Sequence, residues 1–234
     1  MSDKNIRYSR LTTLPEIGPE GLSLLQGSRI MVIGCGALGS MCAMYLAASG
    51  TGNITIADFD TIDISNLQRQ LFFTESQLGK SKASALAERM RSINSEIRVE
   101  VIPKMINRQE ALGRFSEHDV IIDGSDNPAT KLMTDSVCAE IGKPCVIAGV
   151  RGFECQVMTY VPGSVRYSDV FGDSVACSGM TPCSVGGVLG PAAGVAASIQ
   201  ASEAIKLVTG AGTPLTDRLF VLDLLDMSTD VYNM

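Results

Sequence analysis

The chain has 234 residues, of which 45% are hydrophobic and 19% are charged, a balance typical of a globular domain with a buried core. Its formal net charge of −6 argues against a nucleic-acid-binding protein held by a broad basic patch. The odd count of seven cysteines and the single histidine argue against a disulfide framework and leave little for a structural zinc site.

Strand and helix patterns alternate through the first part of the chain. Short apolar runs predict buried strands, and the longer segments between them predict helices. We predict strands at residues 29–33, 54–57, 97–102, 120–122 and 144–148, and helices at residues 37–49, 80–93 and 129–141. Asn127 suits the N-cap of the last of these helices, with Pro128 in its first turn. The alternation predicts an α/β fold, Rossmann-like, with a mostly parallel sheet and helices on both faces.

The pattern changes after Gly152. We predict antiparallel strands at residues 156–161 and 219–224, which extend the sheet, and a helix at residues 191–208 that ends at Gly210. Residues 171–182 are polar and lack periodicity, which is typical of a functional loop. Because no repeat or linker interrupts the chain, we expect a single domain over residues 1–234, with an N-terminal arm at residues 1–27.

A G-x-G-x-x-G pattern lies between the first predicted strand and the first predicted helix, in IGCGALG. Gly34 would form the tight turn, Gly36 would let backbone N–H groups approach a phosphate, and Gly39 would let the helix pack closely on the strand. Asp58 closes the second predicted strand, where a carboxylate can bind ribose hydroxyls. The pattern predicts a bound nucleotide, but it does not distinguish ATP from NAD.

Four further polar residues lie near the predicted C-terminal ends of strands, where open α/β sheets bind ligands. Asn66 and Arg69 follow the second strand, Lys80 opens the next helix, and Asp126 follows the fourth strand. Singly, the two cations would be surface charges and Asp126 would support a helix cap. Together they suit phosphoryl or nucleotidyl transfer, in which negative charge has to be stabilised, and Asp126 suits a magnesium ion that keeps several waters.

The order of these motifs resembles the ThiF/MoeB/HesA family, relatives of the ubiquitin-activating enzymes. The resemblance extends from Arg7 to about Gly210 and rests on RYSRL, GCGALGS, ADFDTIDISNLQRQ, GKSKA, DGSDN and ASEAIKLVTG. It implies an adenylyltransferase that uses Mg·ATP to adenylate the C-terminal glycine of a ubiquitin-like sulfur-carrier protein ending in Gly-Gly. Pyrophosphate is released, and the acyl-adenylate is later converted to a thiocarboxylate. We expect a ThiS-like carrier of thiamin biosynthesis first, and a MoaD-like carrier of molybdopterin biosynthesis second.

The resemblance also implies roles for the residues at matching motif positions. Gly36 would lie against the nucleotide and Asp58 would bind the ribose. Asn66, Arg69 and Lys80 would contact the phosphates. No covalent participation of the protein is needed for this first step, because positioning and charge stabilisation suffice.

The resemblance also implies roles for three further residues. Asp126 would bind magnesium. Arg10, in RYSRL, matches an arginine that reaches the ATP site of the partner subunit in family homodimers; without the resemblance it would be an exposed charge near a terminus. Cys183, in PCSVGGVLGP, matches a cysteine that links covalently to the activated carrier in some members and is dispensable in others, and Cys177 is the neighbouring alternative.

The sequence departs from the family at its zinc site. Members often hold zinc with two Cys-x-x-Cys pairs, but Val165 and Ser168 occupy the positions of the first pair and the tail MSTDVYNM has no cysteine, so we predict no zinc. We expect a homodimer that depends on a separate sulfur donor, because 234 residues leave no room for an appended sulfurtransferase domain. No secretory signal or bilayer-spanning stretch is visible, which predicts a cytoplasmic protein without a membrane segment.

Other functions remain open at this point. An NAD-dependent oxidoreductase would explain the glycine pattern and Asp58. It would give no role to the four polar residues Asn66, Arg69, Lys80 and Asp126. A non-catalytic docking protein would explain the loss of the zinc cysteines, and ATP-dependent modification of tRNA is disfavoured by the acidic composition. His118 precedes the fourth predicted strand and is expected to be a turn residue, because adenylation of an ionised carboxylate needs no general base.

Overall fold

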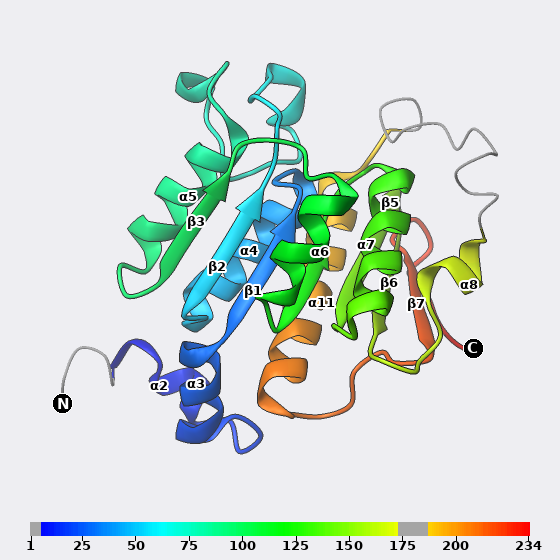
Figure 1. The fold of residues 1–234 in the computed structure, drawn as a ribbon. Coiled ribbons are helices and arrows are strands. Elements are labelled where there is room, and N and C mark those ends of the chain that lie inside the picture. Colours follow the sequence, from blue (N-terminus) through cyan, green and yellow to red (C-terminus); the bar gives the residue numbers. More distant parts are fainter. Residues whose placement is uncertain (1–5, 173–186) are drawn as a thin grey trace.

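A single mixed sheet forms the centre of the protein. The computed structural model describes residues 6–172 and 187–234, and within them the sheet has eight strands in the order β3-β2-β1-β4-β5-β6-β7-β8. The strands are β1 (Arg29–Ile33), β2 (Asn53–Ala57), β3 (Arg98–Ile102), β4 (Val120–Asp123), β5 (Cys145–Arg151), β6 (Glu154–Tyr160), β7 (Arg218–Asp223) and β8 (Ser228–Asn233). Strands β1 to β5 pair in parallel, and β6 to β8 continue the sheet antiparallel (Figure 1). This confirms the predicted fold class.

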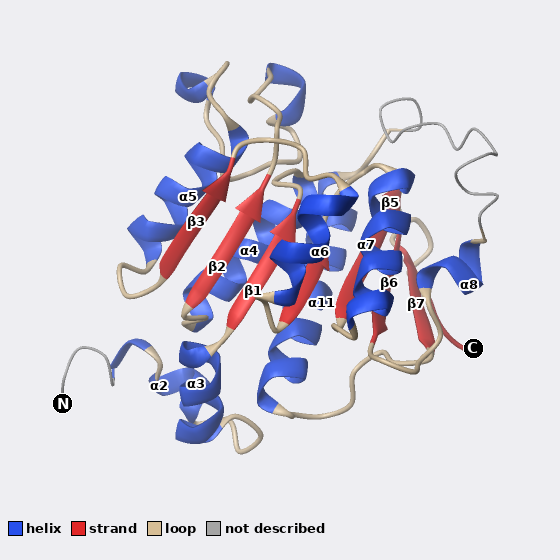
Figure 2. Ribbon diagram, in the orientation of Figure 1, coloured by secondary structure: helices blue, strands red, loops and turns tan. Residues whose placement is uncertain are grey.

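Helices cover both faces of this sheet (Figure 2). The α-helices of the described residues are α2 (Ser9–Thr12), α3 (Gly18–Gly27), α4 (Ala37–Ser49), α5 (Lys82–Ile93), α6 (Arg108–Ser116), α7 (Pro128–Ile141), α8 (Tyr167–Phe171) and α11 (Gly190–Thr209). In β1, Ile30 and Val32 join the core with α4, α5 and α11, whereas Met31 and Ile33 join the core with α6 and α7. The division follows from the strand geometry, because successive side chains point to opposite faces of a sheet.

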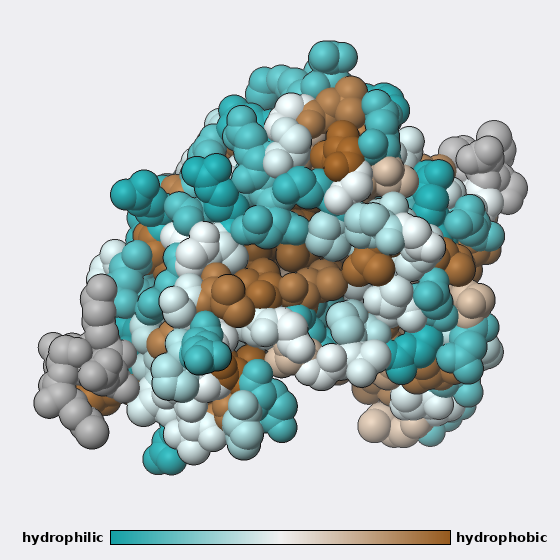
Figure 3. Space-filling model, turned by 60° about the horizontal axis from the view of Figure 1, so that its bottom comes forward, coloured by the Kyte–Doolittle hydropathy of each residue, from teal (hydrophilic) through white to brown (hydrophobic). Residues whose placement is uncertain are grey.

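The N-terminal arm, with α2 and α3, lies beside the N-terminal ends of the parallel strands (Figure 1). Tyr8 anchors it: this side chain is 3% exposed, and its hydroxyl accepts a hydrogen bond of 2.8 Å from Asn94 Nδ2. The ring lies against Gly50, where a Cβ would approach it to 2.7 Å. Figure 3 turns this lower edge of the molecule forward and shows hydrophobic surface gathered in a band across the middle of that face.

The sequence analysis did not predict α2, α3, α6, α8 and β8. The polar helix α6 is stabilised by a capping box, in which Asn107 and Glu110 bond each other's backbone N–H groups, and this N-x-x-E spacing is a signal that could have predicted it. All six residues of β8 are exposed, so the strand lacks an apolar alternation and is defined by its pairing with β7. Of the predicted functional loop, residues 173–182 lie outside the described residues.

Candidate functional site

A pocket lies at the carboxyl ends of β1, β2 and β4, where the strand order reverses. Such a switch point is the usual ligand site of an open α/β sheet, because the loops leaving neighbouring strands diverge there. The residues that define it here come from the glycine turn and from the loops after β2, β3 and β4: Gly34, Gly36, Asp58, Phe59, Asp60, Asn66, Arg69, Gln70, Lys82, Met105, Ile106 and Asp126. The structure thus brings together most of the residues that the sequence nominated.

The glycine turn has the geometry predicted for it. Gly34 has φ +86°, in the left-handed region that favours glycine. A Cβ at Gly39 would lie 1.8 Å from the carbonyl oxygen of Gly34, so α4 can pack this closely on β1 only without a side chain. At Gly36 an added Cβ would lie 3.6 Å from Gln70 Nε2, an ordinary van der Waals contact, so the folded protein does not fill the space beside this backbone. Gly36 is also the N-cap of α4, and its first N–H groups favour an anion.

Asp58 fixes the shape of this turn from the end of β2. Its Oδ2 accepts a 2.6 Å hydrogen bond from Cys35 N, and its Oδ1 accepts one of 2.7 Å from Asp60 N. Burial raises the pKa of the Asp58 carboxyl, and the two N–H donors act in the opposite direction. The carboxylate therefore connects the glycine turn to the loop after β2 and lines the pocket at the same time.

The stretch SNLQRQ forms one wall of the pocket through a short turn of 3-10 helix, Ile64–Asn66. Asn66 is 9% exposed, and its Oδ1 accepts a 3.1 Å bond from Asp63 N. The guanidinium of Arg69 donates to Ser65 O at 2.9 Å. Gln70 is 3% exposed, and among the described residues its Oε1 has no hydrogen-bond partner. A buried amide oxygen without a partner is costly, so this wall is suited to a polar ligand.

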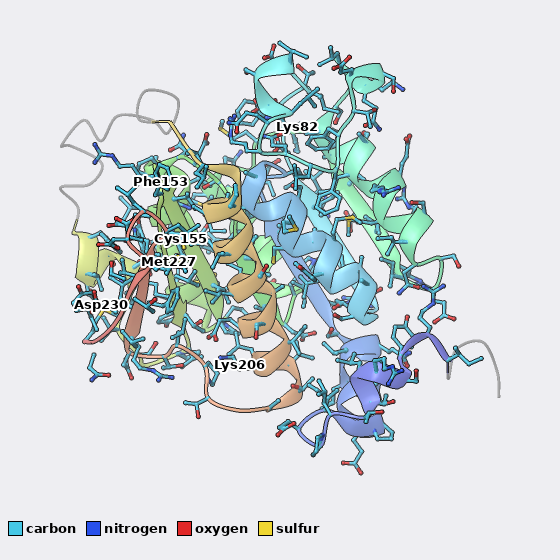
Figure 4. All side chains as sticks on the ribbon, turned by 180° about the vertical axis from the view of Figure 1, so that it is seen from behind. Lys82, Phe153, Cys155, Lys206, Met227 and Asp230 are labelled. Carbon is cyan, nitrogen blue, oxygen red and sulfur yellow. The ribbon has the colours of Figure 1, made fainter. Side chains whose placement is uncertain are left out.

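Of the two lysines in GKSKA, Lys82 lines the pocket and Lys80 does not, which differs from the expectation for Lys80; Lys104 lines the pocket as well. Lys80 is exposed and does not line the pocket, because helix α5 begins two residues later, with Ser81 as its N-cap. Lys82 lines the pocket, and its Nζ lies 2.8 Å from Asp60 Oδ2. Figure 4 shows Lys82 at the carboxyl edge of the sheet, near the loops that follow the strands. The N-cap preference of serine would have selected the second lysine of GKSKA.

Asp126 lies on the loop between β4 and α7 and is exposed in the pocket. The cap of α7 is made by Asn127, whose Oδ1 accepts hydrogen bonds from Ala129 N at 2.8 Å and Thr130 N at 3.4 Å. The predicted N-cap is confirmed, and the Asp126 carboxylate is not needed for it. Within the described ranges, no group of three or more His, Cys, Asp or Glu side chains could hold a metal ion.

The remaining nominated residues lie elsewhere. Arg10 is an exposed residue of α2, at the opposite edge of the sheet from the pocket (Figure 1). Cys183 and Cys177 lie outside the described residues. His118 is buried away from the pocket, where its ring nitrogens bond Arg114 O at 2.7 Å and Thr55 Oγ1 at 2.8 Å. Burial lowers the pKa of His118, in agreement with a structural role.

A comparison with protein families decides the relationship of the chain. The model described as "ThiF family" matches residues 8–234. The chain belongs to the ThiF family. This confirms the family predicted from the motifs.

Curated relatives of this ThiF-family chain have names that state an activity. It is 39% identical over 228 residues to the probable adenylyltransferase/sulfurtransferase MoeZ of Mycobacterium tuberculosis, covering 95% of the chain and 58% of that protein. It is 36% identical over 222 residues to the SAMP-activating enzyme E1 of Haloferax volcanii, covering 95% of the chain and 82% of that protein. The chain therefore spans little more than half the length of the first relative.

The fold of a solved structure matches as well. The crystal structure of E. coli MccB with ATP superimposes with a TM-score of 0.85 at 26% identity, over 97% of this chain and 71% of that one. The part of the ThiF-family chain that the structure describes has no helix both long and apolar enough to cross a membrane.

Proposed function

We propose that the protein is an adenylyltransferase that activates the C-terminal glycine of a ubiquitin-like sulfur-carrier protein. The terminal carboxylate attacks the α-phosphorus of ATP, a P–O bond forms to the carboxylate, and the bond to the leaving pyrophosphate breaks. The observation that carries the proposal is a pocket in which an open glycine turn faces a set of amide and cationic side chains. The names of MoeZ and the SAMP-activating enzyme, and the ATP in MccB, support it.

The pocket residues fit ATP by the chemistry of their donors. The backbone beside Gly36 leaves room for a phosphate, and the buried Oε1 of Gln70, an acceptor without a partner among the described residues, suits a donor of the ligand such as a ribose hydroxyl. Asp58 would accept hydrogen bonds from ribose hydroxyls, as acids at this position of the fold do. Arg69 and Lys82 would stabilise the charge that develops on the phosphates. Apolar side chains after β2 and β3 would cover the base: Phe59, Met105 and Ile106.

A magnesium ion fits the same pocket. Mg²⁺ bound with a nucleotide takes one or two carboxylates and fills the rest of its shell with phosphate oxygens and water. Asp126 would hold it, since this exposed carboxylate lies in the pocket and is not engaged in the helix cap. When bound, the ion would neutralise charge on the phosphates. The proposal includes no zinc site, because Val165 and Ser168 cannot ligate it as cysteines would.

The partners follow from this chemistry. The acceptor would be a carrier with a flexible Gly-Gly terminus, of the thiamin pathway in the first instance and of the molybdopterin pathway in the second. A separate sulfur donor would convert the acyl-adenylate to the thiocarboxylate, with Cys183 as the candidate for a covalent link to the carrier. A cytoplasmic location is part of this proposal.

A homodimer would give Arg10 access to the reaction. Helices α4 and α11 border the ATP pocket at their N-terminal ends, through Ala37 and Ala193, and an apolar groove beside the arm at their C-terminal ends. Tyr45, on the outer face between them, is 49% exposed. A second copy related by a two-fold axis across the middle of these helices would place its arm at the pocket end. Arg10 of that copy would then reach the phosphates.

Carrier-dependent exchange of pyrophosphate into ATP tests the proposal directly. The purified chain would be incubated with Mg·ATP, labelled pyrophosphate and each of the two candidate carriers. A carrier that lacks its terminal glycine is the matched control. We expect exchange with one intact carrier and none with the truncated one. Absence of exchange with both carriers, together with tight binding of NADH, would replace adenylation with oxidoreductase chemistry.

A further inference from the structure

Asp123 ends β4 directly beneath the pocket and is fully buried. Its Oδ1 accepts hydrogen bonds from Ser125 N at 3.0 Å, from Ser125 Oγ at 2.6 Å and from Lys131 Nζ at 3.0 Å. Its Oδ2 accepts one of 2.9 Å from Thr134 Oγ1. The carboxylate thus bonds both the loop that follows β4 and the helix α7 that comes after it.

Lys131, on α7, completes this arrangement from below. It is 6% exposed, and its Nζ donates to Asp123 Oδ1, to Ser125 O at 2.7 Å and to Ala148 O on β5 at 2.7 Å. An ammonium has three donors, so all of them are used. Lys131 is not among the residues that line the pocket, and any effect on a ligand has to pass through the groups it holds.

The residue held most completely is Ser125. Its N–H and hydroxyl bond Asp123, and its carbonyl oxygen bonds Lys131, so its peptide orientation is fixed on both sides. Asp126 follows directly in the chain and presents its carboxylate to the pocket. The loop is also fixed against the glycine turn, because a Cβ at Gly124 would lie 2.6 Å from Gly39 N.

Buried ion pairs are a poor source of stability, since apolar side chains of similar volume often stabilise a fold as well or better. Stability alone therefore does not explain why Lys131 is buried with Asp123. The pair can, however, fix a loop geometry that apolar side chains could not fix. We propose that Lys131 is a positioning residue of the nucleotide site, which holds the loop so that the Asp126 carboxylate faces the phosphates and their magnesium ion. The identity of the ligand in this inference rests on the proposed function. The way in which Lys131 holds the loop rests on the contacts described above.

The test uses two variants and a matched control in the 234-residue chain. Lys131→Met removes the ammonium and leaves Asp123 charged, which is expected to destabilise the fold. The double variant Asp123→Asn with Lys131→Met removes both charges and avoids that penalty. The control is Arg166→Gln, which breaks the 2.8 Å ion pair with Asp135; this carboxylate is also fully buried, but it lies on α7 and outside the pocket lining. Thermal unfolding identifies the variants that remain folded.

Two measurements then distinguish a positioning role of Lys131 from a purely structural role. Hydrogen–deuterium exchange without nucleotide reports on the amides of residues 124–127, and we expect faster exchange in the Lys131 variants only. The Mg²⁺ concentration for half-maximal pyrophosphate exchange should rise about tenfold in the Lys131 variants and remain unchanged in Arg166→Gln, as for residues that orient a metal ligand.

The outcomes are distinguishable. If a folded Lys131 variant matches the Arg166→Gln control in amide protection and in Mg²⁺ response, Lys131 has only a structural role and the inference is overturned. If the unmodified protein gives no exchange with either carrier, the proposed function fails. In that case the amide protection of residues 124–127 still decides whether Lys131 holds the loop.

Discussion

Lys82 and Asp60 form an ion pair on the wall of the pocket, with 2.8 Å between Nζ and Oδ2. The lysine side chain is 8% exposed and the aspartate side chain 48%, so the ammonium is anchored at the boundary between protein and pocket. An ammonium has three donors, and this one bond leaves it able to serve a phosphate. The pair therefore presents a cation to the ligand without burying an unpaired charge.

The first prediction concerns the two lysines of GKSKA. Lys82→Ala should lower kcat/KM of pyrophosphate exchange about a hundredfold, because a group aimed at developing charge is lost. Lys80→Ala should stay close to the unmodified protein, because Lys80 is exposed and outside the pocket lining. Steady-state exchange assays at varied ATP concentrations measure both. Equal losses in the two variants would contradict the assignment of Lys82.

The second prediction separates two glycines of one turn. Gly39→Ala should lower the free energy of unfolding by about 2 kcal/mol, because overpacking forces the backbone apart where a Cβ would lie 1.8 Å from Gly34 O. Gly36→Ala should change it by less than about 1 kcal/mol, the range of N-cap effects. The same Gly36 variant should weaken ATP binding on the order of tenfold, as an added methyl group does in a tight pocket.

Urea unfolding and calorimetric titration with ATP measure these two effects. We expect Gly39→Ala to lose mainly stability and Gly36→Ala to lose mainly affinity for ATP. If Gly36→Ala bound ATP as the unmodified protein does, the phosphate would not lie against this backbone.

The third prediction tests whether Arg10 acts in the partner subunit. Arg10→Ala and Lys82→Ala should each be nearly inactive as homodimers. Co-expression should restore about a quarter of full activity, because half of randomly assembled dimers are mixed and each mixed dimer has one intact site. A mixture of Lys82→Ala with Arg69→Ala should restore none if each pocket depends on its own Lys82 and Arg69. Recovery in the control mixture, or its absence in the first, would contradict action across the dimer.

The fourth prediction is a pH dependence that arises from His118. Burial lowers the pKa of this side chain in the folded protein, so the unfolded chain binds the proton more readily. Stability from this group is present above the ordinary value of 6.5 and is lost as the pH falls through 6.5 toward the folded pKa. Urea unfolding between pH 5 and 8 should show a smaller change in His118→Gln than in the unmodified protein. An identical pH profile would assign the slope to other groups.

The extent of agreement with the sequence analysis has physical reasons. The buried parallel strands, such as β1, were predictable because a short apolar run fits few structures other than a buried strand. The turn at Gly34 was predictable because its left-handed φ favours glycine, and the glycine spacing is visible in the sequence. The confusion of Lys80 with Lys82 arose because side-chain direction depends on where a helix begins. Asp123 and Lys131 gave no signal, since the burial of a charged pair depends on contacts between β4, α7 and β5 that no local pattern reveals.

Gln200 connects helix α11 to the end of β4. Lys131 bonds the same strand end from α7, on the other face of the sheet. The Nε2 of Gln200 donates to Asp123 O at 2.8 Å and to Val146 O at 3.3 Å. A shift of α11 along its axis would therefore break the hydrogen bond from Gln200 Nε2 to the buried carbonyl oxygen of Asp123. Asp123 directly precedes Gly124, which lines the pocket, so the floor of the pocket is fixed by helices from both layers of the fold.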